Sequence, residues 1–140
     1  MKLEEYKGLP DRISVDKLKS MFNEVLINFK QNKLEKNVFL EIISELTDRQ
    51  VMTYEVLDYN VKNDLDIVLS SLWNTDSYDD VDIILSIVVN LGLEKCYKII
   101  KESIQGNNNI DKRIVAEVLE TIEENGDDVA NPYRSLEKFK

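Results

Sequence analysis

The chain has 140 residues and a formal net charge of −9, with 43% hydrophobic and 32% charged residues, one cysteine and no histidine. This length and apolar content predict one domain over residues 1–140 with a buried core. The absence of histidine excludes Ser-His-Asp and Cys-His catalysis and every histidine-containing metal site, and a single cysteine cannot build a thiolate zinc site.

Other signals of chemistry or membrane insertion are also missing from the sequence. It contains no GxxxxGK[ST], GxGxxG or HExxH motif, so we expect no enzyme, no cofactor and no metal. The longest apolar run, ILSIVV, is far shorter than the roughly 20 residues that span a bilayer. The N-terminal residues lack the apolar core of a signal peptide, and Cys96 has no partner within the chain. We therefore expect a cytoplasmic protein without a membrane segment.

Apolar residues recur at helical spacing along most of the chain. One stripe runs through about 15–31 and the next from Val38 to Leu46. Thr47 and Gln50 match a capping box, which predicts a new helix over about 48–59. The remaining pattern predicts helices at about 64–73, 80–91, 95–105 and 112–124, with Gly92, Gly106 and Gly126 after three of them, and a short final helix opened by Asn131-Pro132.

A weak internal repeat links these predicted helices. A shift of 32 residues places the apolar positions of 64–73 over those of 95–105, and Val51, Met52 and Val56 over Ile83, Ile84 and Val88. A shift of 31 residues then carries 83–91 onto 114–122. The order helix, glycine turn, helix, polar turn, helix in VVNLGLEKCYKIIKES–NNNIDKRIVAEVLETI resembles degenerate HEAT-like α-solenoids, which implies protein binding.

The predicted fold is therefore all-α, built from stacked antiparallel helical hairpins in the manner of an α-solenoid; the alternative is an irregular helical bundle. In either case the same apolar face should form the core. The residues expected to be mostly buried are Ile67, Val68, Leu72, Ile84, Ile87, Val88, Ile99, Ile100, Val115, Val118 and Leu119.

Negative charge is concentrated in the middle third of the chain. Residues 1–50 balance nine basic with nine acidic side chains, whereas residues 51–93 hold one lysine, Lys62, against eight carboxylates. A field of this kind repels phosphates and anionic lipid and attracts a basic surface. We therefore expect a basic protein partner, and neither nucleic acid nor a membrane.

The stretch WNTDSYDDVD, residues 73–82, has several interpretations. Counted from Asp76, loop positions 6 and 12 hold Val81 and Ile87, so the EF-hand pattern fails, and a nonspecific cation site or a catalytic carboxylate pair stays open. Ser77 and Asp80 can cap a helix, and general solubility is a further explanation. The remaining interpretation is a partner-binding acidic face with exposed tyrosines, whereas Tyr54 and Trp73 are expected in the core. The candidate partner-binding residues are Asp58, Tyr59, Asp76, Tyr78, Asp79, Asp80 and Asp82.

A small, acidic, histidine-free, all-helical chain with a concentrated negative face resembles the immunity proteins of bacterial polymorphic toxin and contact-dependent inhibition systems. The resemblance implies a protein that binds and neutralises one cognate toxin, commonly a basic nuclease. The second possibility is a solenoid adaptor or scaffold that binds another cytoplasmic or phage protein.

Overall fold

The computed structural model describes residues 2–106, 109–126 and 129. These residues form seven α-helices and no strand, which confirms the all-α prediction. They fall into two compact units, residues 1–62 and 63–140. That residues 1–140 form a single domain stays a prediction, and the final helix expected at Asn131 lies outside the described residues. None of the helices in the described ranges is both long enough and apolar enough to cross a membrane.

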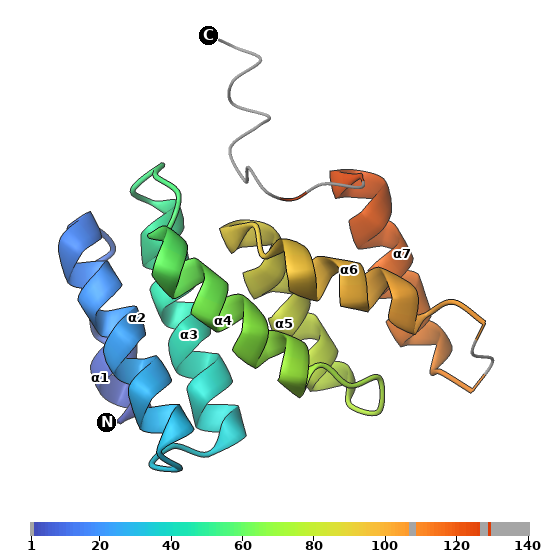
Figure 1. Ribbon diagram of the computed structural model, residues 1–140, viewed down its shortest axis with the longest axis horizontal. Coiled ribbons are helices and arrows are strands. Elements are labelled where there is room, and N and C mark those ends of the chain that lie inside the picture. The colour runs from blue at the N-terminus through green and yellow to red at the C-terminus, as the bar shows by residue number, and fades with distance from the viewer. Residues whose placement is uncertain (1, 107–108, 127–128, 130–140) are drawn as a thin grey trace, which may run out of the picture. The chain divides into compact units, whose positions relative to one another are not determined.

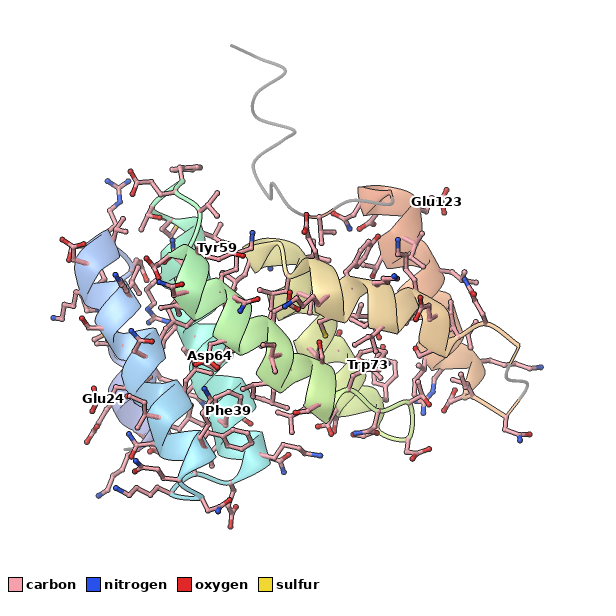
Figure 2. All side chains as sticks on the ribbon, viewed as in Figure 1. Glu24, Phe39, Tyr59, Asp64, Trp73 and Glu123 are labelled. Carbon is pink, nitrogen blue, oxygen red and sulfur yellow. The ribbon has the colours of Figure 1, made fainter. Side chains whose placement is uncertain are left out.

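Unit 1 contains a helical hairpin and one short helix (Figure 1). Helix α2, Val15–Lys30, and helix α3, Lys36–Val51, pack side by side, and the short α1, Leu3–Lys7, packs against α3. The Ser14 hydroxyl accepts a hydrogen bond from the Lys17 amide at 3.3 Å and so begins α2. Phe39, labelled in Figure 2, stacks on Phe29 with ring centroids 4.1 Å apart. The predicted apolar stripes of both helices therefore face one core.

The predicted capping box at Thr47 is wrong, and so is the helix over 48–59. Helix α3 continues through Thr47 to Val51, and residues 52–58 form a turn and a loop. The buried Thr47 hydroxyl donates to the Ile43 carbonyl at 2.7 Å, the back-bonding that lets a threonine sit inside a helix. The overlay of Val51, Met52 and Val56 by a shift of 32 residues fails for the same reason. Val51 is the last residue of α3, and Met52 and Val56 lie in the loop that follows it.

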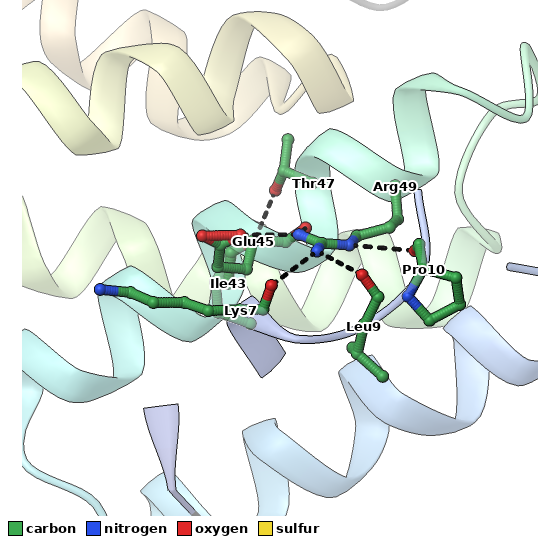
Figure 3. Close-up of polar contacts among 7 residues, drawn as sticks. All are labelled: Lys7, Leu9, Pro10, Ile43, Glu45, Thr47 and Arg49. Atoms are coloured by element: carbon green, nitrogen blue, oxygen red, sulfur yellow. Dashed lines mark hydrogen bonds and ion pairs between the residues drawn. The ribbon is translucent and has the colours of Figure 1, made fainter. Parts of the chain in front are cut away.

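Arg49 on α3 fixes the connector between α1 and α2 (Figure 3). Its guanidinium donates to the carbonyls of Lys7, Leu9 and Pro10 at 3.4, 2.9 and 3.4 Å. It also donates to the carbonyl and to the carboxylate of Glu45, at 3.0 and 2.6 Å. These five bonds engage all five guanidinium N–H groups of a side chain that is only 6% exposed. Arg49 is therefore a structural cation.

Helix α4, Tyr59–Leu72, begins in unit 1, and the unit boundary falls within its first turn. The rest of α4 belongs to unit 2 with α5, Tyr78–Leu91, α6, Glu94–Ser103, and α7, Lys112–Asn125. Helix α5 packs against both α6 and α7, and α6 also packs against α7. Gly92 ends α5 with φ 71°, the left-handed conformation that the sequence predicts at this position.

Polar contacts connect α4 to α6 along their length. Buried Asp66 accepts hydrogen bonds from the backbone amides of Lys95 and Cys96 at 3.0 and 2.8 Å, and thereby caps the start of α6. Near the other ends of the two helices, Trp73 Nε1 donates to the Ser103 hydroxyl at 3.0 Å (Figure 2). Cys96 is fully buried, and this burial raises the pKa of its thiol to about 12.

The repeat prediction has mixed outcomes in unit 2. Under the 32-residue shift, the buried Leu65 and Val68 of α4 match the buried Tyr97 and Ile100 of α6. The matching Ile67 and Ile99, predicted to be buried, are 53% and 39% exposed. Leu119 on α7 is also 53% exposed, while Ile84, Ile87, Val88 and Val118 are buried as predicted, and Leu72 and Val115 are half-buried. A helical face is narrower than the apolar stripe that the sequence shows, so residues at its edge reach solvent. This packing is consistent with stacked hairpins and with a helical bundle.

Candidate partner-binding surface

The acidic stretch forms the turn before α5 and the first turn of that helix. Asn74 Oδ1 accepts hydrogen bonds from the amides of Asp76 and Ser77 at 3.0 and 3.1 Å, which closes the turn. The Ser77 hydroxyl accepts from the Asp80 amide at 3.3 Å and begins α5. Ser77 is therefore confirmed as the N-cap of α5. The capping hydrogen bond is made by its hydroxyl and the Asp80 backbone amide, and it uses no aspartate side chain.

Asp80 differs from the other aspartates of the stretch because it is buried, with 6% exposure. Its Oδ2 accepts a hydrogen bond from Asn74 Nδ2 at 3.3 Å, which ties the first turn of α5 back to the preceding loop. A carboxylate held in this way is part of the fold. Asp80 was predicted to bind a partner, but its buried side chain is not accessible for such a contact.

The other residues of the stretch face solvent. Asp76, Asp79 and Asp82 are exposed, and Tyr78 is 39% exposed. Tyr78 and Asp82 are four residues apart and so lie on the same side of α5. We call Asp76, Tyr78, Asp79 and Asp82 the acidic α5 surface. Its three carboxylates carry the negative charge that the sequence predicts for a partner-binding face.

Helix α7 and its N-cap residue, Asp111, add three groups beside this surface. The Arg113 guanidinium carbon lies 5.1 Å from the centroid of the Tyr78 ring, a cation–π distance. Arg113 also pairs with Asp111 at 3.0 Å, and this hydrogen-bonded pairing lowers the pKa of Asp111. Glu117 is half-buried, and its Oε2 is buried without a hydrogen-bond partner among the described residues. The acidic α5 surface thus continues onto α7.

Glu117 is held close to Asp82 and Tyr78. Desolvation first, and then a hydrogen bond and the negative charge of Asp82, raise the pKa of Glu117 to about 7. Its charge and its hydrogen bond in turn raise the pKa of the Tyr78 phenol. The negative charge of Asp82 therefore favours the protonated form of Glu117.

Asp58 and Tyr59 belong to unit 1, so the predicted set is divided between the two units. Asp58 Oδ2 accepts from the amides of Asn60 and Val61 at 3.1 and 3.2 Å and caps α4, and its other oxygen pairs with Lys19 at 3.4 Å. These hydrogen bonds, that of Val61 first, lower the pKa of Asp58. Tyr59, the first residue of α4, is 78% exposed (Figure 2). Asp58 therefore has a structural role, whereas Tyr59 is available for contact.

Sequence reasoning missed Arg113 and Glu117, which lie more than 30 residues after Tyr78 and Asp82 and meet them only through the packing of α5 on α7. The prediction that Tyr54 lies in the core is wrong, because it is 65% exposed in the loop that follows α3. Trp73 is half-buried. Within the residues that the structure describes, no three histidine, cysteine or acidic side chains are grouped so as to hold a metal ion.

Comparison of the chain with protein-family models, with curated proteins and with solved structures gave no match. What can be said of function therefore depends on the residues and contacts described above.

Proposed function

We propose that this protein is a protein-binding inhibitor, an immunity protein that neutralises a cognate basic toxin through the acidic α5 surface. The observation that supports the proposal most directly is that Asp76, Asp79 and Asp82 are exposed although α5 is capped without their side chains. Side-chain capping hydrogen bonds therefore do not account for these three carboxylates, of which only Asp79 lies in the first turn of α5. Generic solubility explains charge, but it does not explain why the charge gathers beside an exposed tyrosine.

The chemistry of inhibition follows from charge. A toxin that acts on nucleic acid presents a cationic groove to phosphates, and clustered carboxylates compete for the same lysine and arginine side chains. Long-range attraction speeds association, whereas tight binding needs a buried anchor. Tyr78 supplies such an anchor, because its ring can be covered while its hydroxyl keeps a polar contact.

A second candidate function is an α-solenoid scaffold that binds another cytoplasmic or phage protein. Ile67 and Ile99 favour it, because they are exposed at matching positions of α4 and α6. Apolar side chains in register on neighbouring helices are suited to a partner helix. This function would use a different face of unit 2 from the acidic α5 surface.

The deciding experiment is co-expression with a toxin domain encoded beside this chain, such as the variable C-terminal domain of a large secreted protein. Rescue of growth supports the immunity function. Continued toxicity with both proteins expressed and soluble argues against immunity to that toxin, and the scaffold function would then be preferred.

The surface is tested by association kinetics with the same toxin domain. Asp76→Asn with Asp79→Asn should slow association several-fold at low salt and change dissociation less. The matched control is Glu94→Gln with Glu102→Gln, which removes the same charge from exposed positions on α6 of the same unit. Equal slowing by both pairs would mean that only net charge matters and that the acidic α5 surface has no special place in the interface.

A further inference from the structure

The loop that follows α3 exposes three large apolar side chains in unit 1. Met52, Tyr54 and Val56 are 42%, 65% and 47% exposed, at alternate positions of a short segment. Single exposed apolar residues are common, but three within five residues make this segment a candidate interaction site. We call residues 52–56 the apolar loop.

The apolar loop has a defined conformation, which its neighbours fix. Buried Gln50 donates from Nε2 to the Glu55 carbonyl at 2.8 Å, and the Thr53 hydroxyl donates to the Gln50 carbonyl at 2.7 Å. The Thr53 hydroxyl also accepts from the Glu55 amide at 3.1 Å. Between them, Tyr54 has φ 56°, the left-handed region that a residue with a side chain enters at a cost of about 1 kcal/mol or more. The loop is thus held with its apolar side chains outward.

A surface cavity of about 360 Å³ adjoins the loop and shares Met52 with it. The other lining residues are Asp11, Glu45, Asp48 and Arg49. The five guanidinium N–H groups of Arg49 are engaged by carbonyls and by Glu45, so Arg49 has no donor left for a ligand. Three carboxylates against one cation leave the cavity negative. Desolvation and then the charge of Glu45 raise the pKa of Asp48, while Arg49 acts in the opposite direction.

We propose that the apolar loop and this cavity form one docking surface for a protein segment that carries a lysine or arginine flanked by apolar residues. The cavity volume lies at the lower end of the range for ligand pockets, about 300–1,000 Å³, which suits one long side chain. The partner's cation would enter between Asp11 and Asp48, and its apolar neighbours would cover Tyr54 and Val56. The preformed loop lowers the entropy that binding would otherwise cost.

This inference goes beyond the proposed function, because it concerns the other unit and stands whether or not the partner is a toxin. The docking surface of unit 1 also requires a different partner sequence from the acidic α5 surface. The acidic α5 surface attracts positive charge in general, whereas the docking surface of unit 1 requires a basic residue and an apolar residue side by side.

The test uses the full chain as bait for a phage-displayed library of random dodecapeptides. We expect enriched peptides to contain a lysine or arginine next to apolar residues. Asp11→Asn with Asp48→Asn should weaken the binding of a selected peptide at least tenfold, through the lost charge. Tyr54→Gly should weaken it similarly and keep the loop folded, because glycine adopts φ 56° without strain.

The controls separate this surface from other parts of the chain. Glu35→Gln with Glu41→Gln removes equal charge, and Ile27→Ser removes an exposed apolar side chain from α2; both should leave binding within about twofold. In addition, the pKa of Asp48, followed by NMR, should fall when the peptide binds, because a cation stabilises the carboxylate. The inference is overturned if no peptide is enriched, if the enriched peptides lack a basic residue, or if their binding depends on Asp76 and Asp79 instead.

Discussion

Each unit contains a buried charged side chain that joins segments distant in sequence, and the two are satisfied in different ways. Arg49 in unit 1 uses its five N–H groups on carbonyls and one carboxylate, whereas Asp66 in unit 2 accepts two amide hydrogen bonds at the start of α6. The cation holds an irregular connector, and the anion begins a helix. The comparison shows that a charged side chain stabilises the fold when backbone groups supply its hydrogen-bond partners. Such a role is recognised from the burial and contacts of the side chain and not from the sequence.

Of the substitutions that test this comparison, we expect the replacement of Arg49 to lower stability most. Arg49→Ala leaves three partly buried backbone carbonyls and the Glu45 carboxylate without the donor that the buried Arg49 supplies. We expect the free energy of unfolding to fall by about 3 kcal/mol, at the lower end of the usual cost of breaking a buried ion pair, because the Glu45 side chain that is left is 26% exposed. Urea denaturation followed by circular dichroism measures it, and the exposed Arg12→Ala is the control. A loss below about 1 kcal/mol would mean that the network contributes little to stability.

Asp66→Ala should have the next largest effect, at about 2 kcal/mol, because it removes the cap of α6 and leaves the buried Cys96 amide and the partly buried Lys95 amide without an acceptor. Asp66→Asn keeps one acceptor oxygen and should recover about half of the loss. Hydrogen exchange at the Lys95 and Cys96 amides reports the change locally. Unchanged protection of these two amides in the alanine variant would show that Asp66 does not cap α6.

The sequence predicted the helices where periodicity and caps agree, and it failed where a local motif conflicted with packing. Helices α2, α5, α6 and α7 lie close to their predicted ranges, and Ser77 and Gly92 begin and end α5 as expected. Thr47 fits a capping box by residue type, but its buried position in a continuing helix decides its bond to Ile43. Helix α1 has too few residues for a periodic pattern and was not predicted.

The candidate site was predicted in part. Composition located the negative charge, because it depends only on residue counts. Composition could not predict that Asp80 is buried while Asp76, Asp79 and Asp82 are exposed. That difference depends on the turn at Asn74, which forms a hydrogen bond to Asp80. The approach of Glu117 to Asp82 depends on how α5 packs against α7, which no local pattern encodes.

The division within the acidic stretch leads to the third prediction. Asp80→Ala should lower the free energy of unfolding by about 1–2 kcal/mol, because the side chain is buried and holds Asn74. Asp79→Ala should cost about 0.5 kcal/mol or less, the value of an exposed carboxylate near a helix N-terminus. Thermal denaturation of the two single variants measures both. Equal losses would contradict the assignment of Asp80 to the fold and of Asp79 to the surface.

The smallest effect concerns Glu117 and appears as a pH dependence. Its pKa is about 7 in the folded protein against 4.5 for an ordinary glutamate, so the folded state binds the proton more tightly. Stability should therefore be highest below about pH 4.5 as far as this group is concerned, and should fall as pH rises to about 7. Desolvation raises the pKa of Glu117 most, Asp82 on α5 and Glu120 on α7 raise it further, and the hydrogen bond with Tyr78 lowers it.

Glu117→Gln should remove this pH dependence and make the protein slightly more stable than the parent at pH 8, by less than about 1 kcal/mol because water screens a half-buried pair. The exposed Glu120→Gln is the control and should leave most of the slope. Thermal midpoints measured between pH 5 and pH 8 in the three proteins give the comparison. Asp58 and Asp111, whose pKa values are lowered, lose their contribution only below about pH 4 and do not disturb this range. If the glutamine variant kept the slope of the parent, the raised pKa of Glu117 would not be the source of this pH dependence, and the acidic α5 surface would end at α5 instead of continuing onto α7.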